Sequence, residues 1–291
     1  MAHLVEDAAP IGSLLVPDLK LSPAKEAERA AYAPVILFYA KLPTAAATAL
    51  PNSRAPRQRN SAAQVRRGSN QDGPRQQDTA FFMAQLWDGT GFIAQTAVVT
   101  FSLSLAGRLL ARPLSLFSWH PLSQLLGLVT LLQSILVLQP THDAGQKRVG
   151  QAVHAWLNLA SFAAFSAGFA AIYLNKERGA APHFASLHGA LGAALTMLLW
   201  AQYAVGFTMW ATPALYGGEA RARALWKLHR AGGYANLLLI LATFGTAADT
   251  GFVRNVLNVE RWVFYVPMAL IAVGVLPRVH LYKMGFGKRK A

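Results

Sequence analysis

Four short stretches of the chain decide the fold: WHPLSQ (119–124), VHAWLN (153–158), LHGALG (187–192) and LHRAGG (228–233). Each stretch lies close to the beginning of one of four successive apolar segments within residues 119–246, and each carries one histidine. These histidines are His120, His154, His188 and His229.

The spacing of the histidines predicts how they are arranged. They are 34, 34 and 41 residues apart, and a membrane-spanning helix needs roughly 20 residues, so each interval allows one crossing and a connecting loop. Consecutive crossings run in opposite directions. We therefore expect His120 and His188 on one side of a membrane, and His154 and His229 on the other. Two facing histidines on each side form the ligand set of a bis-histidine haem, twice over.

The composition indicates a polytopic membrane protein. Of the 291 residues, 54% are hydrophobic and only 14% are charged, which is unusual for a soluble domain. The absence of cysteine excludes disulfides, zinc–thiolate sites and iron–sulfur clusters. Residues 91–291 carry +12 of the net charge of +14, so residues 1–90 are nearly neutral. A nucleic-acid-binding protein would carry its excess on a soluble domain, so no nucleic-acid partner is expected.

Six segments are long enough and free of charge, and they must be helices because lipid offers the backbone no hydrogen-bond partner. They are Gly89–Gly107, Pro121–Gln139, Val149–Leu174, Phe184–Trp210, Ala231–Ala248 and Trp262–Pro277. The predicted fold is an all-α membrane protein with six transmembrane helices, in which a central four-helix bundle holds two b-type haems. We expect residues 1–88 to form a largely disordered cytosolic region, 89–285 the membrane domain and 286–291 a basic cytosolic tail.

The distribution of Lys and Arg favours both termini in the cytosol. With that orientation the cytosolic side collects Lys147, Arg148, Arg221, Arg223, Lys227, Arg230, Arg278, Lys283, Lys288, Arg289 and Lys290. The other side receives Arg108, Arg112, Lys176, Arg178, Arg254 and Arg261.

Ligation of haem is the interpretation that best fits four histidines within apolar spans, where ionisable residues are rare and functional by default. Two imidazoles fill both axial positions of a haem, whereas a bare zinc or copper ion would need further ligands, and no Asp or Glu lies at the same depths. The alternative for any one histidine is a hydrogen bond to a backbone carbonyl. Small residues one or two turns away would leave room for a flat ring or would serve helix packing. These residues are Gly127, Gly192, Gly232 and Gly233.

Several stretches together resemble the cytochrome b561 family, over roughly residues 91–285. They are Ala111-Arg112-Pro113, Phe117-Ser118-Trp119-His120-Pro121, the basic residues ahead of His154, Phe184-Ala185-Ser186-Leu187-His188, Gln202…Gly206-Phe207…Pro213 and Leu228-His229…Gly233. The resemblance is greatest to the compact branch that consists of the six-helix domain alone, which His183 also matches. Two departures occur near the third ligand, where Phe184–Ala185 and Gly189–Ala190 replace a family tyrosine and a Ser-Trp pair.

The resemblance implies an ascorbate-dependent transmembrane oxidoreductase. Its cofactors would be two b haems on His120, His154, His188 and His229, with cytosolic ascorbate as donor and monodehydroascorbate or a ferric chelate as acceptor. The membrane would be an endomembrane of the ER, a vesicle or the vacuole, and the chain could form a homodimer. No flavin or nicotinamide motif occurs, which argues against a ferric reductase of the NADPH-oxidase type. In that type two histidines recur within a single helix, whereas none of the six predicted crossings carries two.

Cationic residues beside each pair of histidines are candidates for substrate binding. Ascorbate is an anion, and Lys147, Arg148, Lys227 and Arg230 flank the two cytosolic histidines. On the other side, His183 and Arg112 are candidates for binding the acceptor. The ordinary role of such cations is to set topology. The alternative function for the whole chain is a permease or sensor without redox activity, whose histidines serve protons or packing.

Overall fold

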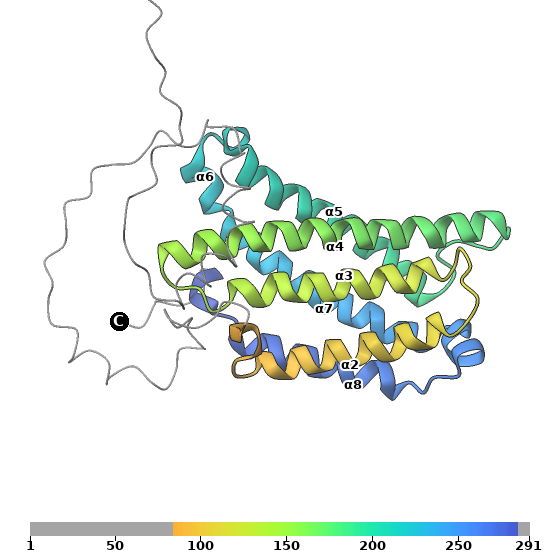
Figure 1. Ribbon diagram of the computed structural model, residues 1–291. Coiled ribbons are helices and arrows are strands. Elements are labelled where there is room, and N and C mark those ends of the chain that lie inside the picture. Colours follow the sequence, from red (N-terminus) through yellow and green to blue (C-terminus); the bar gives the residue numbers. More distant parts are fainter. Residues whose placement is uncertain (1–83, 285–291) are drawn as a thin grey trace, which may run out of the picture. The chain divides into compact units, whose positions relative to one another are not determined.

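The computed structural model describes residues 84–284, and all regular structure within this range is helical (Figure 1). The elements are η3 (Ala84–Trp87), α2 (Gly91–Leu110), α3 (Trp119–Leu138), α4 (Ala144–Arg178), α5 (Leu187–Ala211), η4 (Pro213–Tyr216), α6 (Glu219–Ala224), α7 (Trp226–Ala247), η5 (Phe252–Leu257), α8 (Trp262–Val275), η6 (Leu276–Arg278) and η7 (Leu281–Met284). The all-α prediction is confirmed for these residues. The predictions for residues 1–83 and 285–291 lie outside the described part.

Four described helices are long and apolar enough to cross a membrane, namely α2, α3, α4 and α5. The apolar helix Trp262–Arg278 is shorter. Helix α7 has 22 residues, but Arg230 and Asn236 interrupt its apolar character. The structure therefore supports a membrane protein, and crossings by α7 and α8 belong to the proposal below.

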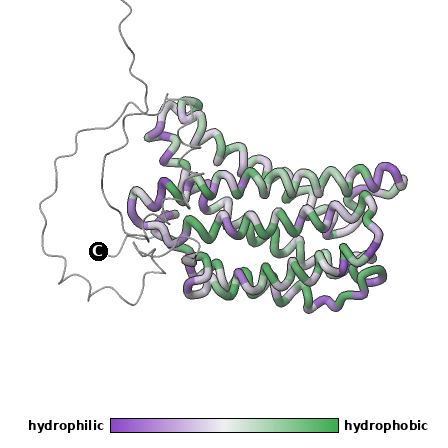
Figure 2. Tube along the Cα trace, in the orientation of Figure 1, coloured by the Kyte–Doolittle hydropathy of each residue, from purple (hydrophilic) through white to green (hydrophobic). Residues whose placement is uncertain are grey.

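Successive long helices run in alternating directions through one bundle (Figure 1). Helix α3 packs along α4, α2 along α8, and α5 along α7. The N-terminal ends of α3 and α5 consequently lie at one end of the bundle, and those of α4 and α7 lie at the opposite end. Hydrophobic residues fill the middle of the bundle, whereas hydrophilic residues gather at its two ends (Figure 2).

Two helices begin at places that the charge-free runs did not mark. Helix α4 starts at Ala144 because the side chain of Asp143 caps it, accepting from the backbone N–H of Gln146 at 2.8 Å. His154 is therefore three turns inside α4 rather than close to its beginning. Helix α5 starts at Leu187, after a cap by Ser186 on Gly189. Phe184, predicted to lie in the crossing, precedes the helix with a positive φ of 55°.

Arg278 was counted among the cations that set topology, but the structure buries it to 1% exposure. Its Nε donates to Oε1 of Gln139 at 3.1 Å, and its terminal nitrogen donates to the carbonyl of Asp88 at 2.5 Å. Gln139 in turn donates to the Tyr234 hydroxyl at 3.2 Å. This network joins the end of α8 to the beginning of α2, the end of α3 and the first half of α7, and it closes one end of the bundle.

Candidate cofactor-binding site

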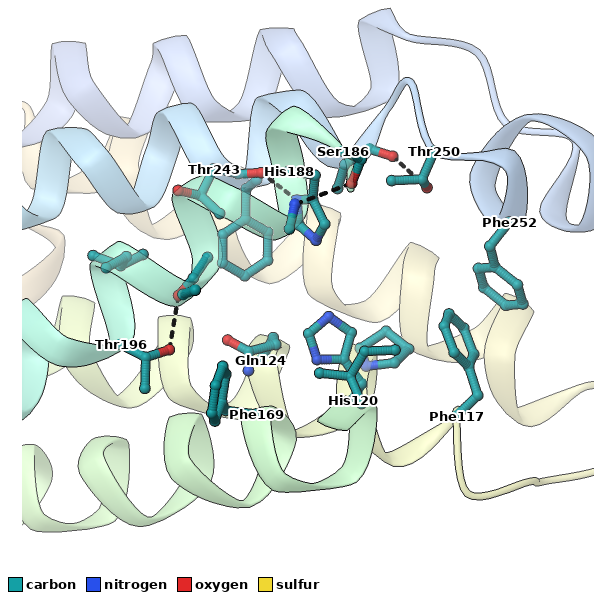
Figure 3. Close-up of a pocket in the computed structure, with 18 of the residues that line it drawn as sticks. Phe117, His120, Gln124, Phe169, Ser186, His188, Thr196, Thr243, Thr250 and Phe252 are labelled. Carbon is teal, nitrogen blue, oxygen red and sulfur yellow. Dashed lines mark hydrogen bonds between the residues drawn. The ribbon is translucent and has the colours of Figure 1, made fainter. Parts of the chain in front are cut away.

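His120 and His188 face each other at one end of the bundle, from the first turns of α3 and α5 (Figure 3). The centres of their rings are 6.2 Å apart, and the ring planes are inclined at 74°. Both side chains line a cavity of about 360 Å³, a size within the range of ligand and cofactor pockets.

Aromatic and aliphatic side chains form most of the wall of this histidine cavity. Phe117 and Phe252 lie together beside His120, with ring centres 4.5 Å apart. Gln124 and Thr196 also line the cavity, but their polar groups already have partners. Gln124 donates to the carbonyl of Phe165 on α4, and Thr196 donates to the carbonyl of Gly192 on its own helix. The cavity is thus mostly apolar, with the imidazoles of His120 and His188 facing each other in it.

His154 and His229 form the second pair, at the opposite end of the bundle, in α4 and α7. The two side chains are close enough to interact electrostatically with each other and with Arg230. The structure thus brings the four histidines together in two pairs, one at each end.

The second ring nitrogen of three histidines is held by a backbone carbonyl. Nδ1 of His120 lies 3.0 Å from the carbonyl of Gly168, Nδ1 of His154 lies 2.8 Å from that of Ser134, and Nδ1 of His188 lies 3.0 Å from that of Thr243. A carbonyl only accepts, so Nδ1 carries the proton and Nε2 keeps its lone pair. The carbonyl bond that a structural histidine would make is present, and it leaves the other nitrogen available as a ligand.

His229 is held differently, by the side chain of Gln202 on α5. The amide nitrogen of Gln202 lies 3.1 Å from Nδ1 of His229 and donates to the His229 carbonyl at 2.6 Å. Gln202 therefore fixes both the ring and the backbone of the fourth histidine.

Two glycines permit the close helix contacts on which these positions depend. A Cβ at Gly168 would lie 2.5 Å from Nε2 of Gln124 and 3.1 Å from the carbonyl of His120, so another residue would displace the Gln124 amide and crowd the contact of α3 with α4. A Cβ at Gly206 would lie 2.7 Å from Cε1 of His229. These glycines let His120 reach its carbonyl acceptor and let His229 lie against α5.

The glycines noted in the sequence were expected either to leave room for a flat ring or to serve helix packing, and the structure shows both situations. A Cβ at Gly127 would lie 2.8 Å from the ring of Phe165, so this glycine serves the packing of α3 on α4. Gly192 lines the histidine cavity, where an added Cβ would meet only Thr243 at 4.0 Å. Gly232 and Gly233 lie against the amide of Gln202.

The geometry of His120 and His188 fits a bis-histidine haem. An imidazole nitrogen lies about 2 Å from a metal that it ligates, and the ring centre lies roughly 1 Å further away, so two imidazoles on opposite faces of one ion have centres ~6 Å apart. The 6.2 Å separation of His120 and His188 matches this value. Within residues 84–284, no group of three or more His, Asp or Glu side chains forms a metal-ion site.

The predicted substrate residues do not gather in one place. His183 lines the histidine cavity, where its Nε2–H donates to the Glu177 carboxylate at 2.9 Å and its ring stacks on Tyr173. Arg112 instead lines a separate pocket with Arg108. The structure therefore does not bring Arg112 and His183 into one acceptor pocket.

At the other end, three of the four cationic candidates are exposed. Lys147 and Arg148 lie in the first turns of α4, and Lys227 lies in the first turn of α7. Arg230 is partly buried and donates to the carbonyl of Lys283, so its guanidinium also holds the C-terminal turn η7 against the bundle.

Residues 119–253, which contain all four histidines, match the family model of eukaryotic cytochrome b561. Over these residues the chain is similar to the cytochrome b561 family. The match runs from the beginning of α3 into η5 and thus covers the four helices that carry the histidines. The resemblance predicted from the sequence is confirmed for this cytochrome b561 segment, and the family implies haem b as cofactor.

A curated relative agrees with this family. The chain is similar to the lysosomal membrane ascorbate-dependent ferrireductase CYB561A3 of Bos taurus, with 28% identity over 100 residues. The aligned part is 34% of this chain and 38% of that protein, so the chain matches little more than a third of the relative's length. No solved structure matches the chain.

Sequence reasoning missed most of the groups that orient the histidines. Gly168, Ser134 and Thr243 act through backbone carbonyls, which every residue possesses, so no side-chain pattern could reveal them. Gln202 and Gly206 stood within a stretch that resembles the family, but their contact with His229 requires the packing of α5 on α7.

Proposed function

We propose that the protein transfers electrons one at a time across a membrane through two bis-histidine b haems, from cytosolic ascorbate to an acceptor on the other side. The observation that carries the proposal is the arrangement of four half-buried histidines as two pairs at opposite ends of one helix bundle. The family match over residues 119–253 supports it independently.

The proposed membrane domain extends over residues 89–285 and has six crossings. Helices α3, α4, α5 and α7 would form the central bundle with the haems, and α2 and α8, which pack on each other, would complete the domain. Four of these helices satisfy both length and apolarity. We assign α7 to the same group because it carries the fourth histidine within the family match, and α8 because its apolar run continues through Leu276–Arg278.

The histidines would hold the two haems, with His120 and His188 on one and His154 and His229 on the other. When bound, haem supplies a one-electron iron couple that needs no protein radical. The protein's part is to fix the ring tautomers of His120, His154 and His188 through the carbonyls of Gly168, Ser134 and Thr243. Gln202 holds the ring and the backbone of His229 in position. The aromatic wall of the histidine cavity would keep water away from the metal and so help to set its potential.

The donor would be ascorbate, bound as an anion beside His154 and His229. Arg148 and Lys227, together with Lys147 and Arg230, supply the positive charge at that end. The acceptor would be monodehydroascorbate or ferric iron, beside His120 and His188, with His183 and Arg112 as candidate contacts. The relative is named an ascorbate-dependent ferrireductase, which favours ascorbate and a ferric acceptor.

We further propose an endomembrane location with both termini in the cytosol, residues 1–88 forming the N-terminal cytosolic region and 286–291 the basic tail. The relative's lysosomal membrane supports the endomembrane part. The orientation rests on the Lys and Arg distribution alone.

A visible absorption spectrum of the purified full-length protein tests the function. We expect the bands of a six-coordinate b haem, a haem-to-chain ratio of two, and reduction of both haems by ascorbate. A protein that is folded but contains no haem would contradict the proposal and favour a permease or sensor. A ratio of one would contradict the assignment of two ligand pairs.

A further inference from the structure

An open pocket with two arginines lies at the end of the bundle that holds His120 and His188. It is lined by Arg108 from the last turn of α2, by Ala111 and Arg112 just after that helix, and by Leu257 of η5. We call it the arginine pocket. Its volume is about 330 Å³, which suits a small molecule.

The two arginines of this pocket lack the acidic partners that neighbouring cations have. Within residues 84–284, neither Arg108 nor Arg112 forms an ion pair. In contrast, Arg261 lies 2.5 Å from Asp249 and Arg254 lies 3.6 Å from Glu260. Arg108 lies in the last turn of α2 and Arg112 follows the C-cap Ala111, so two like charges line one pocket and repel each other. The negative end of the α2 dipole offsets only part of that repulsion. A bound anion would relieve it.

Leu257 connects the arginine pocket to the histidine cavity. This side chain is 4% exposed and lines both spaces, so it forms a common wall between them. A molecule in the arginine pocket would therefore be separated from the cavity of His120 and His188 by a thin apolar layer. Electron transfer across such a layer requires no covalent contact and no entry of the acceptor into the cavity.

We infer that the arginine pocket docks the electron acceptor as a small carboxylate-bearing anion, such as a ferric ion held by a carboxylate chelator. Arginine and carboxylate form charge-assisted, often bidentate hydrogen bonds. This inference rests on the proposed function. The balance of the step is simple: one electron arrives from the proposed cofactor, the ferric ion becomes ferrous, and no bond or proton is transferred.

Gallium(III) citrate provides a direct binding test, because it resembles a ferric chelate but is not reduced by a haem. Its affinity would be measured by calorimetry on the full-length protein in neutral-lipid nanodiscs. We expect Arg108→Gln/Arg112→Gln to weaken binding roughly 5- to 30-fold, and each single variant about 2- to 5-fold. The affinity of the wild type for the probe should fall at 1 M salt, because the screening length is then only about 3 Å.

The matched control is Arg178→Gln/Arg254→Gln, which removes two cations from the same end of the bundle but outside the pocket. We expect it to bind the probe within about twofold of the wild type, since its arginines do not line the pocket. Equal weakening in both double variants would show a general surface potential and overturn the inference. Unchanged affinity in Arg108→Gln/Arg112→Gln would also overturn it. If the double variant does not fold, the two single variants decide in the same way.

A lipid headgroup offers the same anionic oxygens, so the measurement is repeated in nanodiscs with an anionic lipid. We expect the wild type to retain its affinity for the probe within about threefold. Loss of probe binding in anionic nanodiscs only would identify the pocket as a lipid site and overturn the inference. Failure of the proposed function is separately visible as a wild-type spectrum without haem, whereas probe binding reports on the pocket alone.

Discussion

At the scale of single residues, the four histidines were predictable because an ionisable side chain within an apolar run is conspicuous. Their pairing followed from the alternating direction of successive helices. What orients them was not predictable. Three are fixed by carbonyls that belong to Gly168, Ser134 and Thr243, and the fourth is fixed by Gln202, which a sequence would present as an ordinary polar residue.

The pairing makes a prediction about loss of cofactor. Because His154 and His229 would ligate the same iron, His154→Ala and His229→Ala should each remove one haem of two, with the same spectral component missing. His120→Ala and His188→Ala should remove the other. Pyridine haemochrome counting and redox titration measure this directly.

A variant of His120 and a variant of His154 that lose the same component would contradict the assignment. Gly127→Ala is a useful control, since its Cβ would strain the contact with Phe165 without touching a ligand. It should reduce stability while leaving the haem count of folded protein at two.

The exposed cations beside His154 and His229 make a second prediction at this scale. Removing Arg148 and Lys227 should slow reduction by ascorbate roughly 5- to 30-fold, because each exposed charge adds modestly to the binding of an anion. The slowing should diminish as salt rises. Stopped-flow reduction of Arg148→Gln/Lys227→Gln is compared with that of Arg108→Gln/Arg178→Gln, which removes the same charge from the opposite end.

An uncharged reductant separates binding from damage. If it reduces the Arg148→Gln/Lys227→Gln variant as slowly as ascorbate does, the haem itself is perturbed. If neither reductant is slowed, these residues act only as topology signals.

At the scale of elements, charge-free runs located the long helices but not their ends. Runs such as 149–174 mark the part of a helix that lipid would surround, whereas α4 extends to Ala144–Arg178 through residues that water can solvate. The capping residues Asp143 and Ser186 carried the missing signal. Gly127 shows the limit of local pattern, because its packing partner Phe165 is on another helix.

The connection between α7 and α8 gives a prediction about pH. Arg261 donates to Asp249 at 2.5 Å and Tyr265 donates to it at 3.1 Å, and the Arg261 hydrogen bond holds the pKa of Asp249 below its ordinary value. A lowered pKa in the folded state means that the carboxylate stabilises the fold above the ordinary pKa and loses this effect as pH falls through the folded-state value. Asp249→Asn should therefore melt below the wild type at neutral pH.

Melting of both proteins across a pH series checks this expectation. The difference in melting temperature should shrink in the acid range, below the ordinary pKa of an aspartate. A constant difference at all pH values would mean that the substitution acts through packing and not through the charge of Asp249.

At the scale of the whole molecule, the bundle follows from long apolar runs that are visible in the sequence and from the rule that consecutive crossings run in opposite directions. The separation of the arginine pocket from the histidine cavity does not follow from either. It depends on the π-helical segment η5, which brings Leu257 between them. Connections of this kind have no periodic pattern, so the sequence offers Arg112 and His183 as candidates for the acceptor without showing that they line different pockets.

The orientation of the molecule is the last prediction, and the structure changes the basis of the argument for it. The short loops carry six cations on each side, so they are balanced, and the bias comes from the C-terminal residues. Arg278 is buried, while Arg230 and Lys283 bond to backbone carbonyls inside the bundle. The expectation of a cytosolic C-terminus therefore depends chiefly on Lys288, Arg289 and Lys290.

Single cysteines can test this orientation without background, because the chain has none. Ala144 and Ala181 are exposed, and because Ala144 begins α4 and Ala181 follows its end at Arg178, they lie at opposite ends of that long helix. In sealed vesicles with the cytosolic face outward, an impermeant maleimide should label Ala144→Cys directly and Ala181→Cys only after detergent. The opposite pattern would invert the molecule, and the donor would then meet His120 and His188 instead of His154 and His229.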